Sequence, residues 1–321
     1  MQNILLIRLK AIGDVVLTLP AVHAVRENFP SAKISFLTSK ENAPLMQGFR
    51  DVDETLCVDR AALRGGNPLK MTKEISSLLK KLRGGKFSLT VDFQANGESG
   101  WLTRFTGAPE RWGFAKKTTR RWAYTHWSGH HLQLHPAESN GELLRGGGLK
   151  IGALKNEFFL PADALAAARE FFSAHNFLPE KTTLFIQPFT SGAHKNWPLE
   201  NFVAVARHLR GRGAQIIFGG GPGDRAALEP AAREGFVIAA GVPLLVSGGL
   251  MQLSTLVLGG DTGALHLAVA LGKKVLMLMY RADAGSPTPF NHPEFVLEAP
   301  RRALAEIPVA DVTVRCEAVL G

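Results

Sequence analysis

The sequence is poor in the features that mark secreted, cysteine-rich or membrane-spanning proteins. Its 321 residues include only two cysteines, Cys57 and Cys316, too few for a disulfide framework or a cysteine metal cluster. No apolar run is long enough to cross a bilayer. The first apolar stretch has no basic start and is cut short by Arg8 and Lys10, unlike a signal peptide. These absences predict a cytoplasmic protein.

Acidic side chains are also scarce relative to basic ones. The chain has 28 Asp and Glu against 37 Lys and Arg, a net charge of +9. This balance favours an anionic partner, and nucleic acid, lipid headgroups and phosphorylated substrates all fit it. Basic residues are densest at 111–121, close to Trp112, Trp122 and Trp127. Such a mixture suits nucleic acid, carbohydrate or a membrane surface, but without a recognition helix or RNA-binding motif nucleic acid is the weakest option.

Short apolar strands alternate with helices in two separate runs, and no solenoid repeat is present. This βαβ rhythm predicts mostly parallel sheets with helices on both faces. The rhythm loosens between 107 and 161, and the two separate runs predict two domains with a boundary near 155–162. The expected strands cover 4–8, 33–38, 54–58, 88–93, 183–187, 214–218, 236–239, a segment ending at 258, and 274–279; the expected helices cover 16–29, 71–82, 163–175, 199–210, a segment from about 224, and 264–271.

Ligands bind doubly wound sheets at the carboxyl ends of the strands, so the strand-to-helix turns are the places to look for chemistry. The first turn holds Gly13, which permits a tight bend, and Asp14. Asp is a favoured N-cap, and capping is the role that the turn alone favours. A carboxylate facing a cleft can also act as a general base.

Two later turns carry groups suited to phosphate. Thr190 and Ser191 offer hydroxyls and Lys195 a positive charge, which together suit a diphosphate; a solvated surface lysine is the alternative. The glycine-rich segment 219–225 is weaker, since a plain turn explains it and it matches neither a Walker loop nor the dinucleotide fingerprint.

The fourth turn is the segment 261–266, between a buried strand and a helix. Free backbone N–H groups at that helix start form an anion site, and Thr262 adds a hydroxyl. Capping by Asp261 or Thr262 is the alternative. His266 is either a packed helix histidine or a phosphate contact.

Taken together, these segments resemble glycosyltransferase family 9, the ADP-heptose:lipopolysaccharide heptosyltransferases, over nearly the whole chain. Each match is moderate alone, but their order and spacing are typical of the family. The matching segments are IGDVVLTLPA (12–21), VDFQAN (91–96), LTRFTGA (102–108), RWGF (111–114), KNWP (195–198) and DTGALHLA (261–268).

The resemblance implies a GT-B fold, an α/β architecture of two Rossmann-like doubly wound domains facing a central cleft. Residues 1–158 would bind the acceptor and 159–321 the donor, with the last helix a candidate for packing back on the N-terminal domain. The implied reaction is an inverting, metal-independent transfer of heptose from ADP-heptose, a co-substrate, with no cofactor. Asp14 is the implied base. The implied donor-binding residues are Thr190, Ser191, Lys195, Asp261, Thr262, Gly263, Ala264 and His266.

The family's acceptor is the lipopolysaccharide inner core, anionic through Kdo carboxylates and phosphates, which accounts for the basic charge. Peripheral contact with the cytoplasmic face of the inner membrane is expected through the surface near 111–127. The expected acceptor-binding residues are Arg60, Arg64, Arg111, Arg120 and Arg121.

Two segments depart from the family pattern. The loop after 214–218 is glycine-rich with Asp224 as its nearest acid, which puts a ribose contact there in doubt. After Met279 the family's Gly-Pro is replaced by Tyr280 and Arg281, with Asp283 retained. A transferase with another nucleotide sugar or acceptor, and a non-catalytic nucleotide-sugar binder, therefore remain alternatives.

Overall fold

The computed structural model describes residues 2–115, 118–129 and 133–320, without the side chains of Arg64, Thr118 and Arg302. The chain divides into two compact units, Met1–Asn156 and Glu157–Gly321, where the sequence places the boundary after residue 158. Each unit is built on one six-stranded parallel sheet. The expected pair of doubly wound domains is confirmed.

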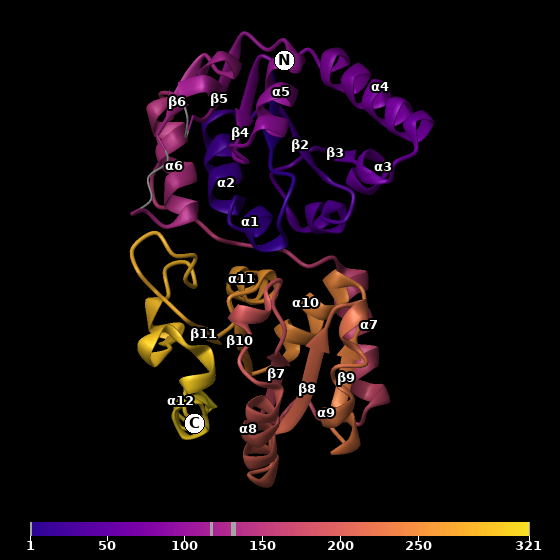
Figure 1. Ribbon diagram of the computed structural model, residues 1–321, viewed down its shortest axis with the longest axis vertical. Helices are drawn as coiled ribbons and strands as arrows, with labels where there is room; N and C mark the ends of the chain where they lie inside the picture. The colour runs from indigo at the N-terminus through magenta and orange to yellow at the C-terminus, as the bar shows by residue number, and fades with distance from the viewer. Residues whose placement is uncertain (1, 116–117, 130–132, 321) are drawn as a thin grey trace. The chain divides into compact units, whose positions relative to one another are not determined.

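The first unit has the strand order β3-β2-β1-β4-β5-β6, so β1 lies centrally beside β4 (Figure 1). The order reverses between these two strands, and ligands bind at such a switch point. Its strands are β1 (Asn3–Ile7), β2 (Lys33–Ser39), β3 (Glu54–Val58), β4 (Leu89–Asp92), β5 (Glu110–Phe114) and β6 (His126–Ser128). Its helices are α1 (Ile12–Val16), α2 (Leu19–Asn28), α3 (Arg60–Arg64), α4 (Pro68–Gly84), α5 (Gly97–Thr106) and α6 (Pro136–Gly146), with the 3-10 segments η1 (Ala43–Gly48) and η2 (Thr118–Ala123).

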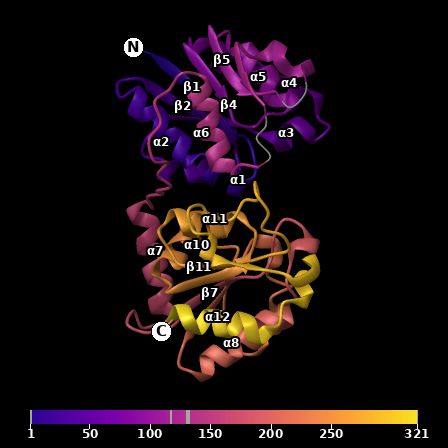
Figure 2. The same ribbon diagram turned by 90° about the vertical axis from the view of Figure 1, so that its left-hand side faces the viewer.

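Helices cover both faces of the first sheet, α3 to α5 on one side and α2 with α6 on the other (Figure 2). Leu5 and Ile7 of β1 pack with Leu78 and Leu82 of α4 in one core cluster. Since side chains alternate along a strand, the intervening Leu6 faces the opposite helices and is also fully buried. This two-sided burial explains why β1 is apolar from Ile4 to Ile7.

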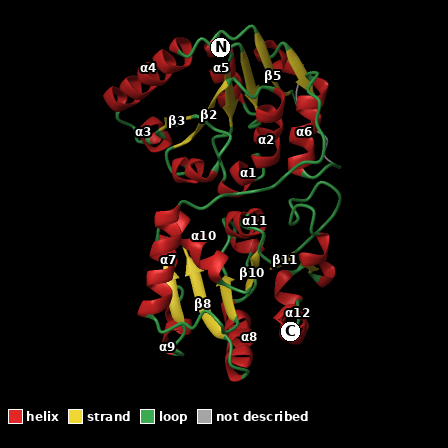
Figure 3. Cartoon of the chain, turned by 180° about the vertical axis from the view of Figure 1, so that it is seen from behind, coloured by secondary structure: helices red, strands yellow, loops and turns green. Residues whose placement is uncertain are grey.

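The second unit has the order β12-β11-β10-β7-β8-β9, with β10 directly beside β7. The turns that follow these two strands therefore lie at the same edge of the sheet (Figure 3). Its strands are β7 (Thr183–Gln187), β8 (Gln215–Gly220), β9 (Val237–Ala240), β10 (Leu256–Gly260), β11 (Val275–Met279) and β12 (Val296–Glu298). Its helices are α7 (Ala162–Ala174), α8 (Leu199–Gly211), α9 (Glu229–Arg233), α10 (Leu244–Leu253), α11 (Gly263–Ala270) and α12 (Val309–Leu320), with η3 (Ala193–Lys195) and η4 (Pro222–Asp224) among the 3-10 segments.

The last helix packs within the second unit, and its expected packing on the first unit stays a prediction. Val312 and Cys316 of α12 are fully buried and join the core cluster of the second sheet. His208 of α8 lies 2.9 Å from Glu317 Oε1. The apolar stripe of α12 thus completes the core beneath α8.

Some expected elements differ from the structure, and α5, α10 and β12 were not expected. The helix expected over 16–29 begins only at Leu19 as α2, and Val16 ends the separate short helix α1. At the break the Thr18 hydroxyl donates to the Val15 carbonyl, and Pro20 lies in the first turn of α2. The loosened stretch 107–161 contains β5, β6 and α6. Strands of three to five residues are too short for their periodicity to stand out among glycines and histidines.

Candidate active site

A cavity of about 310 Å³ opens at the carboxyl edge of the first sheet. It is formed by the turns after β1 and β4, the end of β5 and the start of α6. Its position agrees with the switch point between β1 and β4. The lining residues are Arg8, Asp14, Leu17, Phe93, Gln94, Ala95, Phe114, Pro136, Ser139 and Asn140.

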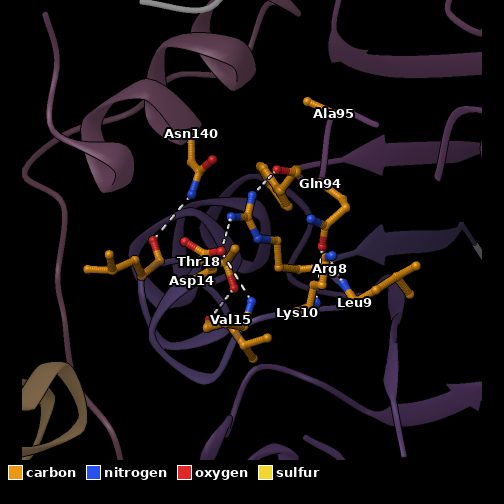
Figure 4. A network of polar contacts seen from close by, with 12 residues as sticks. Arg8, Leu9, Lys10, Asp14, Val15, Thr18, Gln94, Ala95 and Asn140 are labelled. Atoms are coloured by element: carbon orange, nitrogen blue, oxygen red, sulfur yellow. Dashed lines mark hydrogen bonds and ion pairs between the residues drawn. The ribbon is translucent and has the colours of Figure 1, made fainter. Parts of the chain in front are cut away.

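Ala11 holds the N-cap position of α1, and Asp14 lies in the first turn, where its side chain supplies the capping contact considered for it from the sequence. Its Oδ2 accepts a hydrogen bond from the Ala11 amide at 3.1 Å, which caps the helix. The same oxygen pairs with Arg8 Nη2 at 2.8 Å (Figure 4). Among the described residues no hydrogen bond or ion pair engages Oδ1, and the side chain remains 43% exposed. One carboxylate oxygen is therefore fixed while the other is available at the cavity.

Arg8 is a site residue that the sequence analysis missed. It follows β1 directly, and its guanidinium donates to the Phe93 carbonyl as well as pairing with Asp14. The side chain is only 16% exposed. A charged side chain directly after a buried strand is a signal that sequence reading can use, because it must lie at the carboxyl edge of the sheet.

Gln94 connects the turn after β4 to the turn after β1. Its Oε1 accepts hydrogen bonds from the Leu9 and Lys10 amides at 2.9 and 3.1 Å. On the far side of the cavity, Asn140 Nδ2 donates to the Leu17 carbonyl at 3.2 Å, which ties α6 to the end of α1 (Figure 4). These amide side chains fix the backbone around Asp14.

The buried carboxylate of Asp92 fixes the turn that contains Gln94. Asp92 Oδ1 accepts from the Gln94 and Ala95 amides at 2.8 and 3.2 Å, and Oδ2 accepts from the Tyr124 hydroxyl at 2.7 Å. Burial raises the pKa of Asp92, although the hydrogen bond from Tyr124 acts in the opposite direction. Burial and the neighbouring Asp92 also raise the pKa of Tyr124, which keeps its hydroxyl protonated as a donor.

The expected acceptor arginines are not equivalent. Arg120 donates to the carbonyl of Ala95, a cavity residue, at 2.9 Å. Arg60 lies at the start of α3 and pairs with Glu98 at 3.3 Å. Arg64 lies in α3, but its side chain is outside the described part of the chain.

Arg111 and Arg121 have other surroundings. Arg111 donates to the carbonyls of Ala108 and Ala123, and burial lowers its pKa. It therefore supports the η2 segment. Arg121 lies 5.1 Å from the centre of the Trp127 ring. Lys116 and Lys117, which belong to the same basic stretch, lie outside the described residues.

In the second unit, three of the expected donor residues form a polar cluster at the adjacent ends of β7 and β10. Lys195 Nζ pairs with Asp261 Oδ2 at 2.6 Å, and His266 Nε2 lies 3.4 Å from Asp261 Oδ1. Burial tends to raise the pKa of Asp261, but hydrogen bonds and charge from His266 and Lys195 outweigh it and the pKa is lowered. His266 is 3% exposed, and within the described chain its Nδ1 has no hydrogen-bond partner.

The loop carrying Thr190 is organised by an asparagine that the sequence analysis did not single out. Asn196 Oδ1 accepts from the Thr190 amide at 2.8 Å. The Thr190 hydroxyl lies 2.9 Å from both Asn196 Oδ1 and the Gly192 carbonyl, and its single proton goes to one of them. Ser191 is exposed. The neighbouring Trp197 of the KNWP segment is buried and donates to the Ile307 carbonyl, so its role is structural.

The start of α11 provides free backbone donors beside this cluster. Thr262 is the N-cap residue, yet its side chain makes no capping hydrogen bond. The Asp261 carboxylate is occupied by Lys195 and His266, so neither residue fills the capping role considered for it. The first N–H groups of a helix lack intrahelical acceptors, which leaves Gly263 and Ala264 suited to an anion.

The two departures from the family pattern are also located in the second unit. Asp224 Oδ2 accepts from the Gly221 amide at 2.7 Å, which closes the glycine-rich turn. Arg281 and Asp283 form an ion pair after β11. The Tyr280 ring lies edge-on to His194 at 6.3 Å, next to the Lys195 loop.

Metal and membrane features were sought across residues 2–115, 118–129 and 133–320. No group of three or more His, Cys, Asp or Glu side chains there could hold a metal ion. None of the helices in these ranges combines the length and apolar character needed to cross a membrane.

Comparison with known proteins gives consistent results. A family model described as glycosyltransferase family 9 (heptosyltransferase) matches residues 75–307. The chain is 23% identical to lipopolysaccharide heptosyltransferase 3 of Escherichia coli (strain K12), over 84% of this chain and 80% of that protein. It superimposes on the glycosyl transferase family 9 protein of Veillonella parvula DSM 2008 with a TM-score of 0.87 and 19% identity, covering 99% and 97% of the two chains.

A further similar structure is E. coli heptosyltransferase WaaC with ADP-2-deoxy-2-fluoro heptose. Its TM-score is 0.78 at 20% identity, and 99% of each chain is covered. At this level of identity the structural likeness establishes the fold, which is GT-B with two Rossmann-like domains.

Proposed function

Because the chain belongs to glycosyltransferase family 9, the heptosyltransferases, we propose that it transfers heptose from ADP-heptose to the inner core of lipopolysaccharide. The observation that carries this proposal is the Lys195–Asp261–His266 cluster beside the uncapped start of α11. It combines a cation with free backbone donors, as a departing diphosphate requires. The curated relative is named for lipopolysaccharide, and a structural relative is described with an ADP-heptose analogue.

The donor diphosphate would bind between Lys195 and the first turn of α11. The Lys195 ammonium has three N–H donors, so it can keep its contact with Asp261 and still donate to a phosphate oxygen. Asp261 then acts to hold the ammonium in position. A lysine and a helix N-terminus can stabilise the charge of the leaving ADP without a metal ion.

On the acceptor side, Asp14 would act as the general base. An acceptor hydroxyl gives its proton to Asp14 Oδ1 while its oxygen forms a bond to the anomeric carbon. The bond from that carbon to the diphosphate oxygen breaks at the same time, and ADP leaves with the electron pair. Attack opposite the leaving group inverts the anomeric configuration. Arg8 fixes the other oxygen of Asp14, which aims Oδ1 at the cavity.

The anionic acceptor would contact the guanidinium groups nearest the cavity. Arg8 lines it, and Arg120 is bonded to the cavity residue Ala95. Arg60 and Arg64, which both lie in α3, remain proposed acceptor contacts. Arg111 contributes by holding η2 in place, because its donors are bonded to backbone carbonyls. The protein is proposed to work at the cytoplasmic face of the inner membrane.

A donor and acceptor screen with the purified protein tests this function. ADP-heptose should turn over with Kdo-lipid A or a heptosylated form of it, while UDP- and GDP-sugars should not. Asp14→Asn should lower turnover by about 10²–10⁴-fold with ADP binding retained, as for loss of a general base. The matched control is Asp163→Asn, an exposed carboxylate in the first turn of α7, which should leave turnover unchanged.

A second candidate is transfer of another sugar from a nucleotide donor. It is favoured by the loop after β11, where Tyr280 lies next to His194 of the Lys195 loop and is followed by the Arg281–Asp283 pair. Preferred turnover of another nucleotide sugar in the same screen would support it. Binding of ADP without turnover of any donor would favour the non-catalytic alternative.

A further inference from the structure

Three aromatic side chains form an exposed cluster on the first unit. Trp101 and Phe105 project from α5, and Trp122 from η2; they are 57%, 40% and 45% exposed. The ring centres of Trp101 and Trp122 are 4.4 Å apart, and those of Trp101 and Phe105 are 6.0 Å apart. Single exposed apolar residues are ordinary, but a contiguous aromatic cluster on a surface indicates a binding site.

The fold itself does not need these rings. The inner face of α5 carries Leu102, which packs against the core, and small or polar residues that include the fully buried Ser99 and Thr103. Thr103 Oγ1 donates to the Ser99 carbonyl at 2.9 Å, and Gly100 lies close to Ala123. An amphipathic helix normally turns its largest apolar residues toward the core. In α5 only Leu102 does so, and the two larger rings of Trp101 and Phe105 remain exposed.

Cationic side chains surround the aromatic cluster. Arg104 is exposed on α5 between Trp101 and Phe105, and Arg121 is exposed next to Trp122. The Arg83 guanidinium reaches the end of α5, since a Cβ built at Gly107 would lie 2.6 Å from its Nη1.

The acidic side chains nearest to this surface are already engaged. Glu98 of α5 pairs with Arg60 at 3.3 Å. Glu110 of β5 accepts hydrogen bonds from Trp112 Nε1 and the Thr125 hydroxyl. Arg60 offsets the charge of Glu98, whereas Glu110 keeps its charge because its donors are neutral. Three arginines against one such carboxylate leave an excess of positive charge next to the rings, which is complementary to an anionic partner.

We propose that Trp101, Phe105 and Trp122, with Arg83, Arg104 and Arg121, form a membrane-docking surface that binds bilayers containing anionic headgroups. Tryptophan rings favour the boundary between headgroups and acyl chains, and arginines beside them contact anionic headgroups. This combination of amphipathic rings and cations favours a lipid surface over a protein partner. The inference rests on the proposed function in one respect: membrane docking would bring the enzyme to an acceptor that is held in a membrane.

The surface differs from the one expected at 111–127. Trp112 is 6% exposed and donates to Glu110, and Arg111 is bonded to backbone carbonyls. Neither is available to a bilayer. The stretch contributes Arg121 and Trp122, while α5 supplies the rest of the aromatic cluster.

The experiment is sedimentation of the full chain with vesicles of phosphatidylcholine alone or mixed with phosphatidylglycerol. The protein should sediment with the mixed vesicles. Trp101→Ser/Trp122→Ser and Arg104→Glu/Arg121→Glu should each weaken this binding by about tenfold or more. The matched controls are Val314→Ser, a 61% exposed apolar residue of α12, and the exposed Lys181→Glu, which should bind like the parent.

Other outcomes are distinguishable. Absence of vesicle binding by the parent, or full binding by both double variants, would overturn the proposal. So would self-association that is lost in Trp101→Ser/Trp122→Ser, since the surface would then be a protein interface. Thermal unfolding of each variant checks its fold, and the arginine pair is exposed and suited to substitution. Transfer to a deacylated acceptor should be unaffected in the tryptophan variant, so vesicle binding without any transfer would count against the proposed function alone.

Discussion

Replacing Tyr124 with Phe removes the hydroxyl oxygen that contacts Asp92, the residue that fixes one wall of the cavity lined by Asp14. The Tyr124 side chain is 5% exposed, and its hydroxyl donates to Asp92 Oδ2 at 2.7 Å. Phe keeps the ring, so no cavity is created. The cost is that of leaving a buried carboxylate oxygen without a donor, about 1–3 kcal/mol. For a domain of this size, each kcal/mol lowers Tm by about 2–4 °C, so Tm should fall by about 2–12 °C.

The same substitution should impair turnover. Asp92 also holds the Gln94 and Ala95 amides, and Gln94 in turn holds the turn that leads to Asp14. If loss of the Tyr124 hydroxyl shifts Asp92 and the Gln94 turn by a fraction of an ångström, kcat/KM should fall by about 10- to 100-fold. Calorimetry and steady-state kinetics measure the two effects.

The loss of stability should depend on pH in a defined direction. Burial raises the pKa of Asp92 and the hydrogen bond from Tyr124 opposes this rise, so the variant should raise it further. A carboxyl group whose pKa is raised by folding binds more protons in the native state than in the unfolded state. Stability therefore falls as pH increases from the unfolded pKa, about 3.9, to the folded one. The Tm difference from the parent should be larger at neutral pH than in mild acid.

The control is Tyr280→Phe, which changes the chain's other tyrosine at a 37% exposed position. It should leave Tm unaltered. If Tyr124→Phe also kept Tm within about 1 °C of the parent, and kcat/KM were unchanged, the buried Asp92–Tyr124 pair would not support the site.

Three further variants test the second unit. Gly260→Ala places a Cβ 2.9 Å from Thr190 Cγ2 and 3.0 Å from the Lys195 carbonyl, so calorimetric ADP binding should weaken by about 1–3 kcal/mol; unchanged affinity would locate the donor elsewhere. Asn196→Ala removes the acceptor for the Thr190 amide and should raise the Kd for ADP about fivefold, whereas an equal Kd would contradict its positioning role. Lys195→Met should raise the lowered pKa of Asp261. A carboxyl group whose pKa is lowered by folding stabilises the fold above its unfolded pKa, about 3.9, and this stabilisation is lost as pH falls. The acid-unfolding midpoint of Lys195→Met should therefore move to higher pH. An unchanged midpoint would show that Lys195 does not stabilise the Asp261 carboxylate.

Many of the strands could be predicted from the sequence because buried parallel strands are predominantly apolar. The strands expected at 54–58 and 183–187 have the bounds of β3 and β7. The sequence analysis did not predict α5, α10 or β12, nor the elements between 107 and 161, where β6 is only His126–Ser128. A strand this short forms because it pairs with a segment that is distant in the sequence. The local pattern of apolar residues does not indicate that pairing.

The candidate site was partly predictable for a related reason. Asp14, Lys195 and Asp261 follow strands at glycine-containing turns, so sequence order alone places them at sheet edges. Arg8 was missed because its importance lies in its distance to Asp14, which depends on side-chain packing. Asn196 was missed for the same reason, since its contact with the Thr190 loop is visible only in the folded chain.

The most direct test of the central claim is mass spectrometry of Kdo-lipid A, or a heptosylated form of it, after incubation with the purified chain and ADP-heptose. The account predicts an acceptor heavier by one heptose with the parent protein and an unmodified acceptor with Asp14→Asn, although both bind ADP. An unmodified acceptor with the parent protein, or undiminished transfer by Asp14→Asn, would contradict it.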